Sequence, residues 1–387
     1  MKERIHLLYE SLFVTPRPFP PGNYQATTTT DDGSPLRLHL RVEKDGEGIL
    51  VINASTILHL NPTATEIAYH IIQKTPEEEA FKEMMKRYRV DELVIREDFT
   101  NFKDRIHSII HTPDLDPETF LDVDRLELHD KEISAPLRLD CALTYQLSNG
   151  DASIFAPTDR VQRNLDSGEW KTIFNKAWQV GIPHVIFTGG EPTLRPDLPE
   201  LVQAAQDLGQ VTGLITDGLR FTEKDYLHQL LQAGLDHVLF ILDPEDSQSW
   251  EALRDLTNED IFVTAHLTIN TKNQADAVGL LSKLKKLGIR SLSLSADSEK
   301  TKQAMGIFQQ KSAEYGFTLV WDLPVPYSHN NPISAEMEAA ESRKEGAGRT
   351  WLYIEPDGDV LPGQGINKVL GNFLSDPWEE IWLKATR

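Results

Sequence analysis

The sequence contains very little cysteine: Cys141 is the one cysteine among 387 residues. A single thiol excludes an internal disulfide and any metal site made of cysteines alone. Long apolar runs are missing too, since no stretch reaches the roughly 18 to 20 residues that cross a bilayer as a helix. The first residues include Lys2, Glu3 and Arg4 and lack the apolar run of a secretory signal. We therefore expect a cytoplasmic protein.

Positive charge is scarce as well. Lys and Arg number 39 against 60 Asp and Glu, which gives a formal net charge of −21. Such a chain repels a phosphate backbone and an anionic membrane surface, so neither nucleic acid nor a membrane is expected as a partner. The sequence also lacks a Gly-x4-Gly-Lys-Ser/Thr loop, a Gly-x-Ser-x-Gly elbow and a His-Glu-x-x-His pattern. These absences argue against a nucleoside triphosphatase, a serine hydrolase of the elbow type and a zinc peptidase.

The first part of the chain predicts a small α+β domain over residues 36–110. Residues 36–60 are rich in β-branched and apolar residues and are interrupted by a turn at 44–48, which predicts two strands and then a third, short one. Asn61 is a candidate N-cap with Pro62 at the first helical position. The apolar spacing that follows predicts three helices.

The pattern changes after residues 111–136, whose many aspartates and prolines are typical of a linker. Residues 1–35 are assigned as an N-terminal arm. Beyond the linker, strands alternate with helices as in βα units around a parallel sheet. The expected strands are 137–145, 184–188, 211–216, 237–243, 262–270 and 291–295. These six units are two fewer than in a closed barrel of the usual kind, so a partial barrel over residues 137–316 and an open α/β sheet both fit.

Two strand ends carry candidate ligand-binding residues, because ligands of parallel α/β sheets bind at the carboxyl ends of the strands. Thr188-Gly189-Gly190-Glu191-Pro192 follows the second strand and Thr216-Asp217-Gly218 follows the third. Taken alone, Gly-Gly-Glu-Pro is a turn. Leu-Thr-Tyr also ends the first strand and Leu-Asp the fourth, and with these motifs residues 137–315 resemble the radical S-adenosylmethionine (SAM) family. The resemblance implies a six-unit partial barrel.

The flanking segments extend this resemblance. Residues 36–110, with Leu60-Asn61-Pro62 between a strand and a helix, resemble the winged-helix-like PqqD peptide-recognition domain. Residues 317–387 predict a strand, a hairpin that turns at Glu355-Pro356-Asp357-Gly358, and a short helix, and they resemble the SPASM extension of peptide-modifying members. In that class the small domain holds the leader of a ribosomally made precursor peptide while the barrel modifies its core.

The sequence departs from the family where the iron–sulfur cluster would be bound. The family places Cys-x3-Cys-x2-Cys after the first strand, and here Leu147, Asp151 and Ile154 occupy those positions. Leucine and isoleucine have no donor atom, and one aspartate cannot hold a cluster alone. In the SPASM-like tail, Glu345 and Gly363 stand where cysteines of an auxiliary cluster are expected. We therefore expect no iron–sulfur cluster and no radical chemistry by the family mechanism.

SAM binding without a cluster is a separate question. The resemblance assigns the methionyl amino group to the backbone of Gly189 to Glu191, the ribose to Thr216 and Asp217, and the carboxylate to Arg254. Ile241 replaces a serine that the family often uses for SAM, and the anchoring iron is missing as well. We expect the affinity for SAM to be weak or lost.

Two functions fit these observations. The first is a degenerate radical SAM-like protein that binds a precursor peptide and assists its maturation, alone or with a partner modifying enzyme. The second is an enzyme that reuses the barrel mouth for cluster-independent modification of a peptide or small molecule, with or without SAM. Its candidate catalytic residues are Glu191, Asp217 and Asp151.

The chemistry of these candidates has simpler alternatives. Burial would raise the pKa of Glu191 into the range of a general base, but a carboxylate at this position also braces its own turn. Asp151 and Asp217 could share a magnesium ion, although solvated loop aspartates are the default. Cys141, inside the first strand, is expected to be a small buried hydrophobe.

Overall fold

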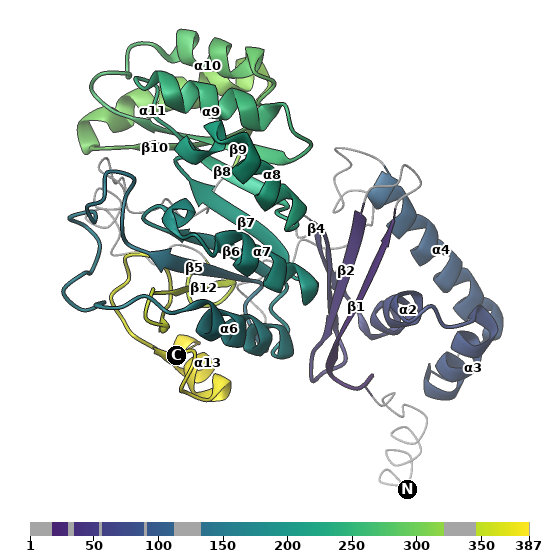
Figure 1. Ribbon diagram of the computed structural model, residues 1–387. Coiled ribbons are helices and arrows are strands. Elements are labelled where there is room, and N and C mark those ends of the chain that lie inside the picture. The colour runs from purple at the N-terminus through teal and green to yellow at the C-terminus, as the bar shows by residue number, and fades with distance from the viewer. Residues whose placement is uncertain are drawn as a thin grey trace, which may run out of the picture. The chain divides into compact units, whose positions relative to one another are not determined.

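The structure, a computed structural model, describes residues 18–29, 35–53, 56–88, 91–111, 133–320 and 346–386. The chain divides into two compact units, Met1–Glu127 and Leu128–Arg387 (Figure 1). The division lies inside the segment 111–136 that the sequence predicts as a linker. Within the described residues, no helix combines the length and the apolar character needed to cross a membrane.

Unit 1, Met1–Glu127, contains an antiparallel sheet with helices against it (Figure 1). Its strands, in their order across the sheet, are β1 (Gly22–Thr29), β2 (Pro35–Val42), β3 (Gly48–Ile52) and β4 (Thr56–Leu60). Its helices are α2 (Pro62–Ile72), α3 (Glu77–Tyr88) and α4 (Glu92–His111). The side chain of Asn61 accepts a hydrogen bond from the Ala64 amide, 2.9 Å long, so the predicted N-cap of α2 is confirmed.

Strand β1 is additional to the three strands that the sequence predicts for this unit, and it lies in the segment assigned as an arm. It pairs with β2 along its whole length, from Gly22 opposite Val42 to Thr29 opposite Pro35. Only Tyr24 and Ala26 are hydrophobic in β1, and both pack against the core of the unit. So weak an apolar pattern gives no strand signal by itself.

Unit 2, Leu128–Arg387, is built on a ten-stranded sheet in which β5 to β12 pair in parallel. Its strands, in their order across the sheet, are β11 (Thr318–Leu319), β10 (Ser291–Ala296), β9 (Phe262–Ile269), β8 (His237–Leu242), β7 (Val211–Thr216), β6 (His184–Gly189), β5 (Arg138–Thr144), β12 (Trp351–Ile354), β13 (Asp359–Leu361) and β14 (Gly371–Asn372). In the described part of the chain this sheet ends at β11 and β14. The predicted α/β fold with a parallel sheet is confirmed.

Helices connect the parallel strands of unit 2. They are α6 (Ser167–Gln179), α7 (Leu198–Asp207), α8 (Lys224–Gln232), α9 (Ser247–Thr257), α10 (Ala277–Lys286) and α11 (Glu299–Tyr315), with α13 (Trp378–Ala385) near the end and two short 3-10 turns, η1 (Pro192–Leu194) and η2 (Leu219–Thr222). Helices α7 to α11 each follow a strand of the sheet closely, as the alternating sequence pattern predicts, whereas the loop 145–166 separates α6 from β5.

The tail joins the same sheet. Strand β12 lies parallel to β5, with Trp351 opposite Arg138 and Ile354 opposite Cys141. The hairpin that β12 forms with β13 therefore stands beside the first strand of the βα series. The sheet does not stop at residue 316, where the sequence places the end of the partial barrel.

The two faces of the sheet differ in polarity. Alternate residues of a strand point to opposite faces. One face, which includes Phe187 and Phe240, packs into the main core with the helices. On the other face, β6 to β8 carry a small apolar cluster beside His184 and His237, whose Nε2 atoms lie 2.8 Å apart, whereas β9 and β10 carry buried polar side chains. The apolar ones are Ile186, Ile215, Leu239 and Ile241, and the polar ones are Thr264, His266, Ser291, Ser293 and Ser295.

Candidate functional site

The turn after β6 pairs closely with the end of β5. Gly190 donates its amide hydrogen to the Thr144 carbonyl and Glu191 donates to that of Gln146, each over 2.7 Å. Gly189 has φ +129°, and a Cβ atom there would lie 2.1 Å from the Thr144 carbonyl oxygen. One on Gly190 would lie 2.2 Å from that of Gln146. The two glycines are therefore required by the approach of the neighbouring strand end.

Glu191 braces this turn. Its side chain is only 2% exposed, and its carboxylate accepts hydrogen bonds from the Thr193 amide at 2.9 Å and the Thr193 hydroxyl. It also accepts from the Thr216 hydroxyl at 2.7 Å and the Asp217 amide at 2.8 Å, so it joins the ends of β6 and β7. Burial, followed by the negative charge of Asp217, raises the pKa of Glu191 to about 8.

Asp217 is held by the loop that follows β5. The Ser148 hydroxyl donates to one oxygen of Asp217 over 2.5 Å, and the Leu219 amide donates to the other over 3.1 Å. The loop is also closed on itself, because the Leu147 amide donates to the Asp151 carbonyl at 2.7 Å. The Asp151 amide in turn donates to the side chain of Asn149 at 3.1 Å. Two sequence-predicted site residues, Glu191 and Asp217, thus lie together, and Ser148 joins them as a residue that the sequence did not single out.

The positions that would carry cluster cysteines do not converge. Leu147 is buried at 7% exposure, whereas Ile154 is 90% exposed and Asp151 is exposed as well. Leu147 and Ile154 therefore do not form a shared aliphatic plug. Gly363 lies in the tail, where an added Cβ atom would be 3.6 Å from the indole nitrogen of Trp351. Glu345 lies outside the described residues.

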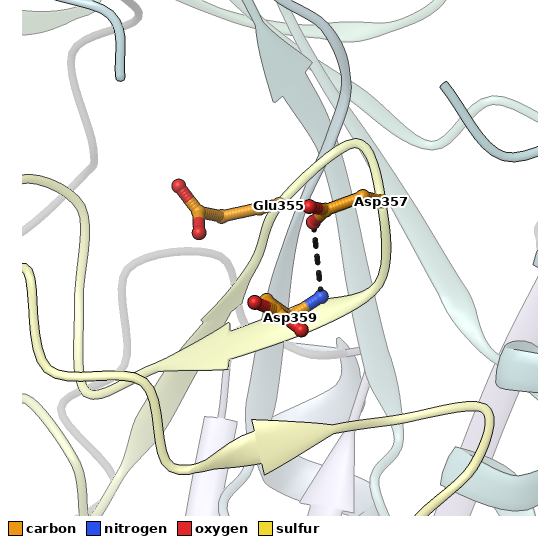
Figure 2. A group of neighbouring side chains, drawn as sticks. All are labelled: Glu355, Asp357 and Asp359. Atoms are coloured by element: carbon orange, nitrogen blue, oxygen red, sulfur yellow. Dashed lines mark hydrogen bonds between the residues drawn. The ribbon is translucent and has the colours of Figure 1, made fainter. Parts of the chain in front are cut away.

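The turn between β12 and β13 gathers three carboxylates: Glu355, Asp357 and Asp359 lie within 4.8 Å of one another (Figure 2). Glu355 is fully buried, accepts a hydrogen bond from the Tyr145 hydroxyl at 2.8 Å and forms an ion pair with Arg160. Burial raises the pKa of Glu355, and the bonds from Arg160 and Tyr145 oppose that rise. The Arg160 guanidinium already supplies the positive charge that this cluster requires.

This network was not predicted. The sequence identifies Glu355-Pro356-Asp357-Gly358 as a turn and Leu-Thr-Tyr as the end of a strand, but nothing in either segment signals that Tyr145 and Glu355 are in contact. They are 210 residues apart in the chain. The pairing of β12 with β5 brings them together, and Glu355 thereby contacts Tyr145 and Arg160 in the loop after β5.

The remaining predicted residues lie elsewhere. Arg254 is an exposed residue in the last turn of α9, and its charge helps to lower the pKa of Lys283 on α10, after burial. Among the described residues no hydrogen bond or ion pair joins Arg254 to the turn after β6. Cys141 is fully buried, and burial raises the pKa of its thiol well above its ordinary value, so the prediction of a small buried hydrophobe is confirmed.

A cavity of about 480 Å³ lies beside the Gly-Gly-Glu-Pro turn. Thr144, Gln146, Leu194 and Arg195 contribute to its wall. The Arg195 guanidinium donates to Asp197 at 2.9 and 2.7 Å and to the Leu165 carbonyl at 2.8 Å, so its charge is balanced inside the chain. The volume is in the range of small-molecule sites.

Comparison with known proteins shows what the chain is similar to. Residues 141–261 match the model of the Radical SAM superfamily. The chain is homologous to PqqA peptide cyclases. Over 260 residues it is 25% identical to the enzyme of Rhizobium meliloti (strain 1021). This match covers 57% of this chain and 67% of the relative. Over 290 residues it is 27% identical to the enzyme of Streptomyces rochei. This match covers 65% of this chain and 77% of the relative.

Solved structures show the same fold. Streptococcus suis SuiB bound to its precursor peptide SuiA has a TM-score of 0.61 and 18% identity, and the match covers 92% of this chain and 88% of that one. SuiB bound to S-adenosylmethionine has a TM-score of 0.58 and 16% identity over the same shares of the two chains. The chain thus has the α/β fold of radical SAM proteins.

Proposed function

We propose that this protein binds a ribosomally made precursor peptide and assists its maturation without forming a radical. Similar proteins support a precursor peptide as the binding partner. Two are PqqA peptide cyclases, and the structure of SuiB contains the precursor peptide SuiA. In this proposal residues 36–110 are a PqqD-like recognition domain and residues 317–387 a SPASM-like extension. A partner modifying enzyme and a cytoplasmic location are part of the same proposal.

The observation that carries the proposal is the loop after β5. Its three family ligand positions offer one oxygen donor and no sulfur, and iron–sulfur clusters require thiolate or imidazole ligands. The same loop is held by internal hydrogen bonds, by Ser148 on Asp217 and by Tyr145 on Glu355. These contacts support a loop that keeps its shape through its own side chains.

SAM binding is weak or lost in this proposal. The amides of Gly190 and Glu191 are bonded to the end of β5, and Ile241 packs against apolar neighbours on the inner face of the sheet. The oxygens of Glu191 already accept several hydrogen bonds from its own turn and from β7. A ligand at this turn therefore meets few polar groups that are not already used.

The edge of the unit 1 sheet is the proposed peptide site. A peptide can add to an exposed sheet edge as a strand through main-chain hydrogen bonds. Among the described strands β1 and β4 are the edges, and β4 exposes Ile57, a large apolar side chain that is 38% exposed. The matching exposed side of β1 carries Gln25 and Thr27. We therefore propose that the peptide pairs with β4.

The test is titration of the full-length protein with a synthetic precursor peptide, chosen from the small open reading frames beside its gene. We expect binding that Ile57→Glu weakens at least about tenfold, because a buried apolar contact is replaced by a charge. Thr27→Glu, the matched control on β1, should leave the affinity unchanged. Binding to none of these peptides contradicts the proposal, and equal loss in the two variants contradicts the choice of β4.

An alternative function is an enzyme that uses the barrel mouth without a cluster, with Glu191, Asp217 and Asp151 as its catalytic residues. The specific observation in its favour is the pKa of Glu191, which is raised to about 8 and so suits a proton-transfer group. The alternative predicts that the protein modifies the peptide at a rate whose pH dependence matches the titration of Glu191. The Glu191→Gln variant should then show no modification. Unchanged peptide mass after incubation favours the binding role.

A further inference from the structure

Helix α2 of unit 1 buries polar atoms that have no hydrogen-bond partner among the described residues. These atoms are one carboxylate oxygen of Glu66, Oε1, and both ring nitrogens of His70. Glu66 is fully buried and His70 is 1% exposed. Buried polar groups are almost always hydrogen-bonded in folded proteins, so Glu66 Oε1 and His70 Nε2, which lie 3.7 Å apart, point to a bound group that satisfies both.

The carboxylate oxygens of Glu66 and Glu83 lie on two sides of His70 Nε2. Glu66 and His70 are four residues apart on α2 and so lie on the same side of the helix. His70 Nε2 lies 3.7 Å from Glu66 Oε1 and 3.9 Å from Glu83 Oε2, which comes from α3. Both distances are too long for a hydrogen bond, yet they are close to the roughly 3.3 Å that separates neighbouring ligands of a tetrahedral metal ion.

The charges favour a cation over an anion. Two carboxylates and an imidazole meet here, and one positive charge is nearby, because Arg87 donates to the other oxygen of Glu66, Oε2, over 2.8 Å. That contact leaves Glu66 Oε1 pointing at His70. The oxygens of Glu66 and Glu83 lie more than 4.8 Å apart, so a shared ion requires Glu83, which is 50% exposed, to rotate toward Glu66 and complete the site from the solvent side.

We propose that Glu66, His70 and Glu83 bind one divalent transition-metal ion. One imidazole nitrogen with two carboxylate oxygens matches Zn²⁺, which takes nitrogen and oxygen ligands at about 2.0 to 2.2 Å and can hold water at a fourth position. The ion joins α2 to α3 and fixes the helical layer of unit 1. The proposal does not depend on the proposed peptide function.

The test measures zinc on the full-length protein. The protein is stripped with a chelator, loaded with Zn²⁺ alone and desalted, and its metal content and its Kd against a chromophoric chelator are determined. We expect one retained equivalent and a higher Tm with zinc than without. Loading with Co²⁺ should give the visible absorption of a four- or five-coordinate site.

Variants locate the ion. Glu83→Gln removes the half-exposed ligand without disturbing the buried pair, and it should weaken zinc binding at least about tenfold. Glu79→Gln, an exposed change on the same helix, should have no effect. Asp357→Asn should also have no effect, which excludes the carboxylate cluster between β12 and β13. His70→Gln should abolish retention, and Glu83→Gln decides the matter if that variant does not fold.

Three results would overturn the proposal. They are the absence of retained zinc in the unaltered protein, an equal Kd in Glu83→Gln and the unaltered protein, and loss of the ion in Asp357→Asn. The last two would show that the ion binds elsewhere in the chain. The first would show that water or a shifted side chain satisfies His70 instead.

Discussion

Two buried glutamates lie at strand ends of the same sheet, Glu191 after β6 and Glu355 after β12. Their carboxylates have different hydrogen-bonding and charged partners. Glu355 forms an ion pair with Arg160 and accepts a hydrogen bond from Tyr145. Glu191 has uncharged donors, two hydroxyls and two amides, and the like charge of Asp217 nearby. The pKa of both is raised by burial, but only Glu355 has a cation that opposes the rise.

The difference teaches how each end of the sheet is stabilised. Glu355 keeps its charge through a cation, whereas the donors around Glu191 favour its charged form and burial and the charge of Asp217 oppose it. The two strands flank β5, so the loop after β5 is fixed on one side by a charge pair and on the other by a hydrogen-bonded turn. Each side can be broken separately.

The largest effect is expected from removal of the cation. Arg160→Met leaves the charge of Glu355 buried without a partner, and we expect a loss of about 2 to 4 kcal/mol in the free energy of unfolding, since Arg160 is 35% exposed and water softens the penalty. Urea denaturation measures it. The double variant Arg160→Met, Glu355→Gln should recover most of the loss. The control Arg163→Met breaks the exposed ion pair with Glu169 and should cost less than about 1 kcal/mol. If Arg160→Met is as stable as the unaltered protein, the ion pair of Arg160 with Glu355 does not stabilise the fold.

The second effect concerns Glu191. Glu191→Ala leaves the Thr216 hydroxyl and the Asp217 amide without their acceptor, and it should cost about 2 to 3 kcal/mol. Glu191→Gln keeps one oxygen that accepts from Thr193 and Thr216 and loses the acceptor of the Asp217 amide, so it should cost less than Glu191→Ala. Thermal unfolding of the two variants side by side measures the difference. Equal losses would mean that the negative charge itself is needed.

The pH dependence separates the two sides further. The pKa of Glu191 is raised from 4.5 to about 8, so the folded state binds more protons than the unfolded one, and stability falls as pH rises through this range. The pKa values of His237 and His266 are lowered by burial from 6.5 to about 4, so stability falls as pH drops below 6.5. We expect a maximum near pH 6.5 in urea denaturation.

Above that maximum the decline should amount to about 2 kcal/mol by pH 8, and Glu191→Gln should abolish it. Glu355→Gln is the contrasting variant, because it alters the ion pair and leaves the titration of Glu191 intact. A decline that persists in Glu191→Gln would assign the titration to another group.

The smallest effect is expected at Cys141, which lies on β5 between the two strands. Cys141→Ala removes one buried sulfur and should cost about 1 kcal/mol. In the unaltered protein a thiol reagent should label Cys141 only as fast as the chain unfolds, because the thiol is fully buried and its pKa is raised. Rapid labelling of folded protein would show that β5 is exposed between its neighbours.

Local sequence patterns predict most of the regular structure. The six strands from β5 to β10 and the N-cap at Asn61 follow from hydrophobic spacing and capping chemistry, which act over a few residues. Strand β1 is missed because its residues carry almost no apolar signal.

The candidate site is predicted only in part, for a physical reason. The turn motifs indicate that Glu191 and Asp217 share one end of the sheet. The contact of Ser148 with Asp217 spans 69 residues, and that of Tyr145 with Glu355 spans 210. Such pairs depend on which strands become neighbours, and the insertion of β12 beside β5 has no local signal.

The central claim is that the loop after β5 keeps its shape without a cluster, and metal analysis tests it most directly. The full-length protein is reconstituted anaerobically with iron and sulfide, desalted and analysed for both elements and for the absorption of a four-iron cluster. The account predicts neither stoichiometric iron nor sulfide, with the same urea denaturation curve before and after the treatment. Near-stoichiometric iron and sulfide, with reductive cleavage of added SAM, would contradict it.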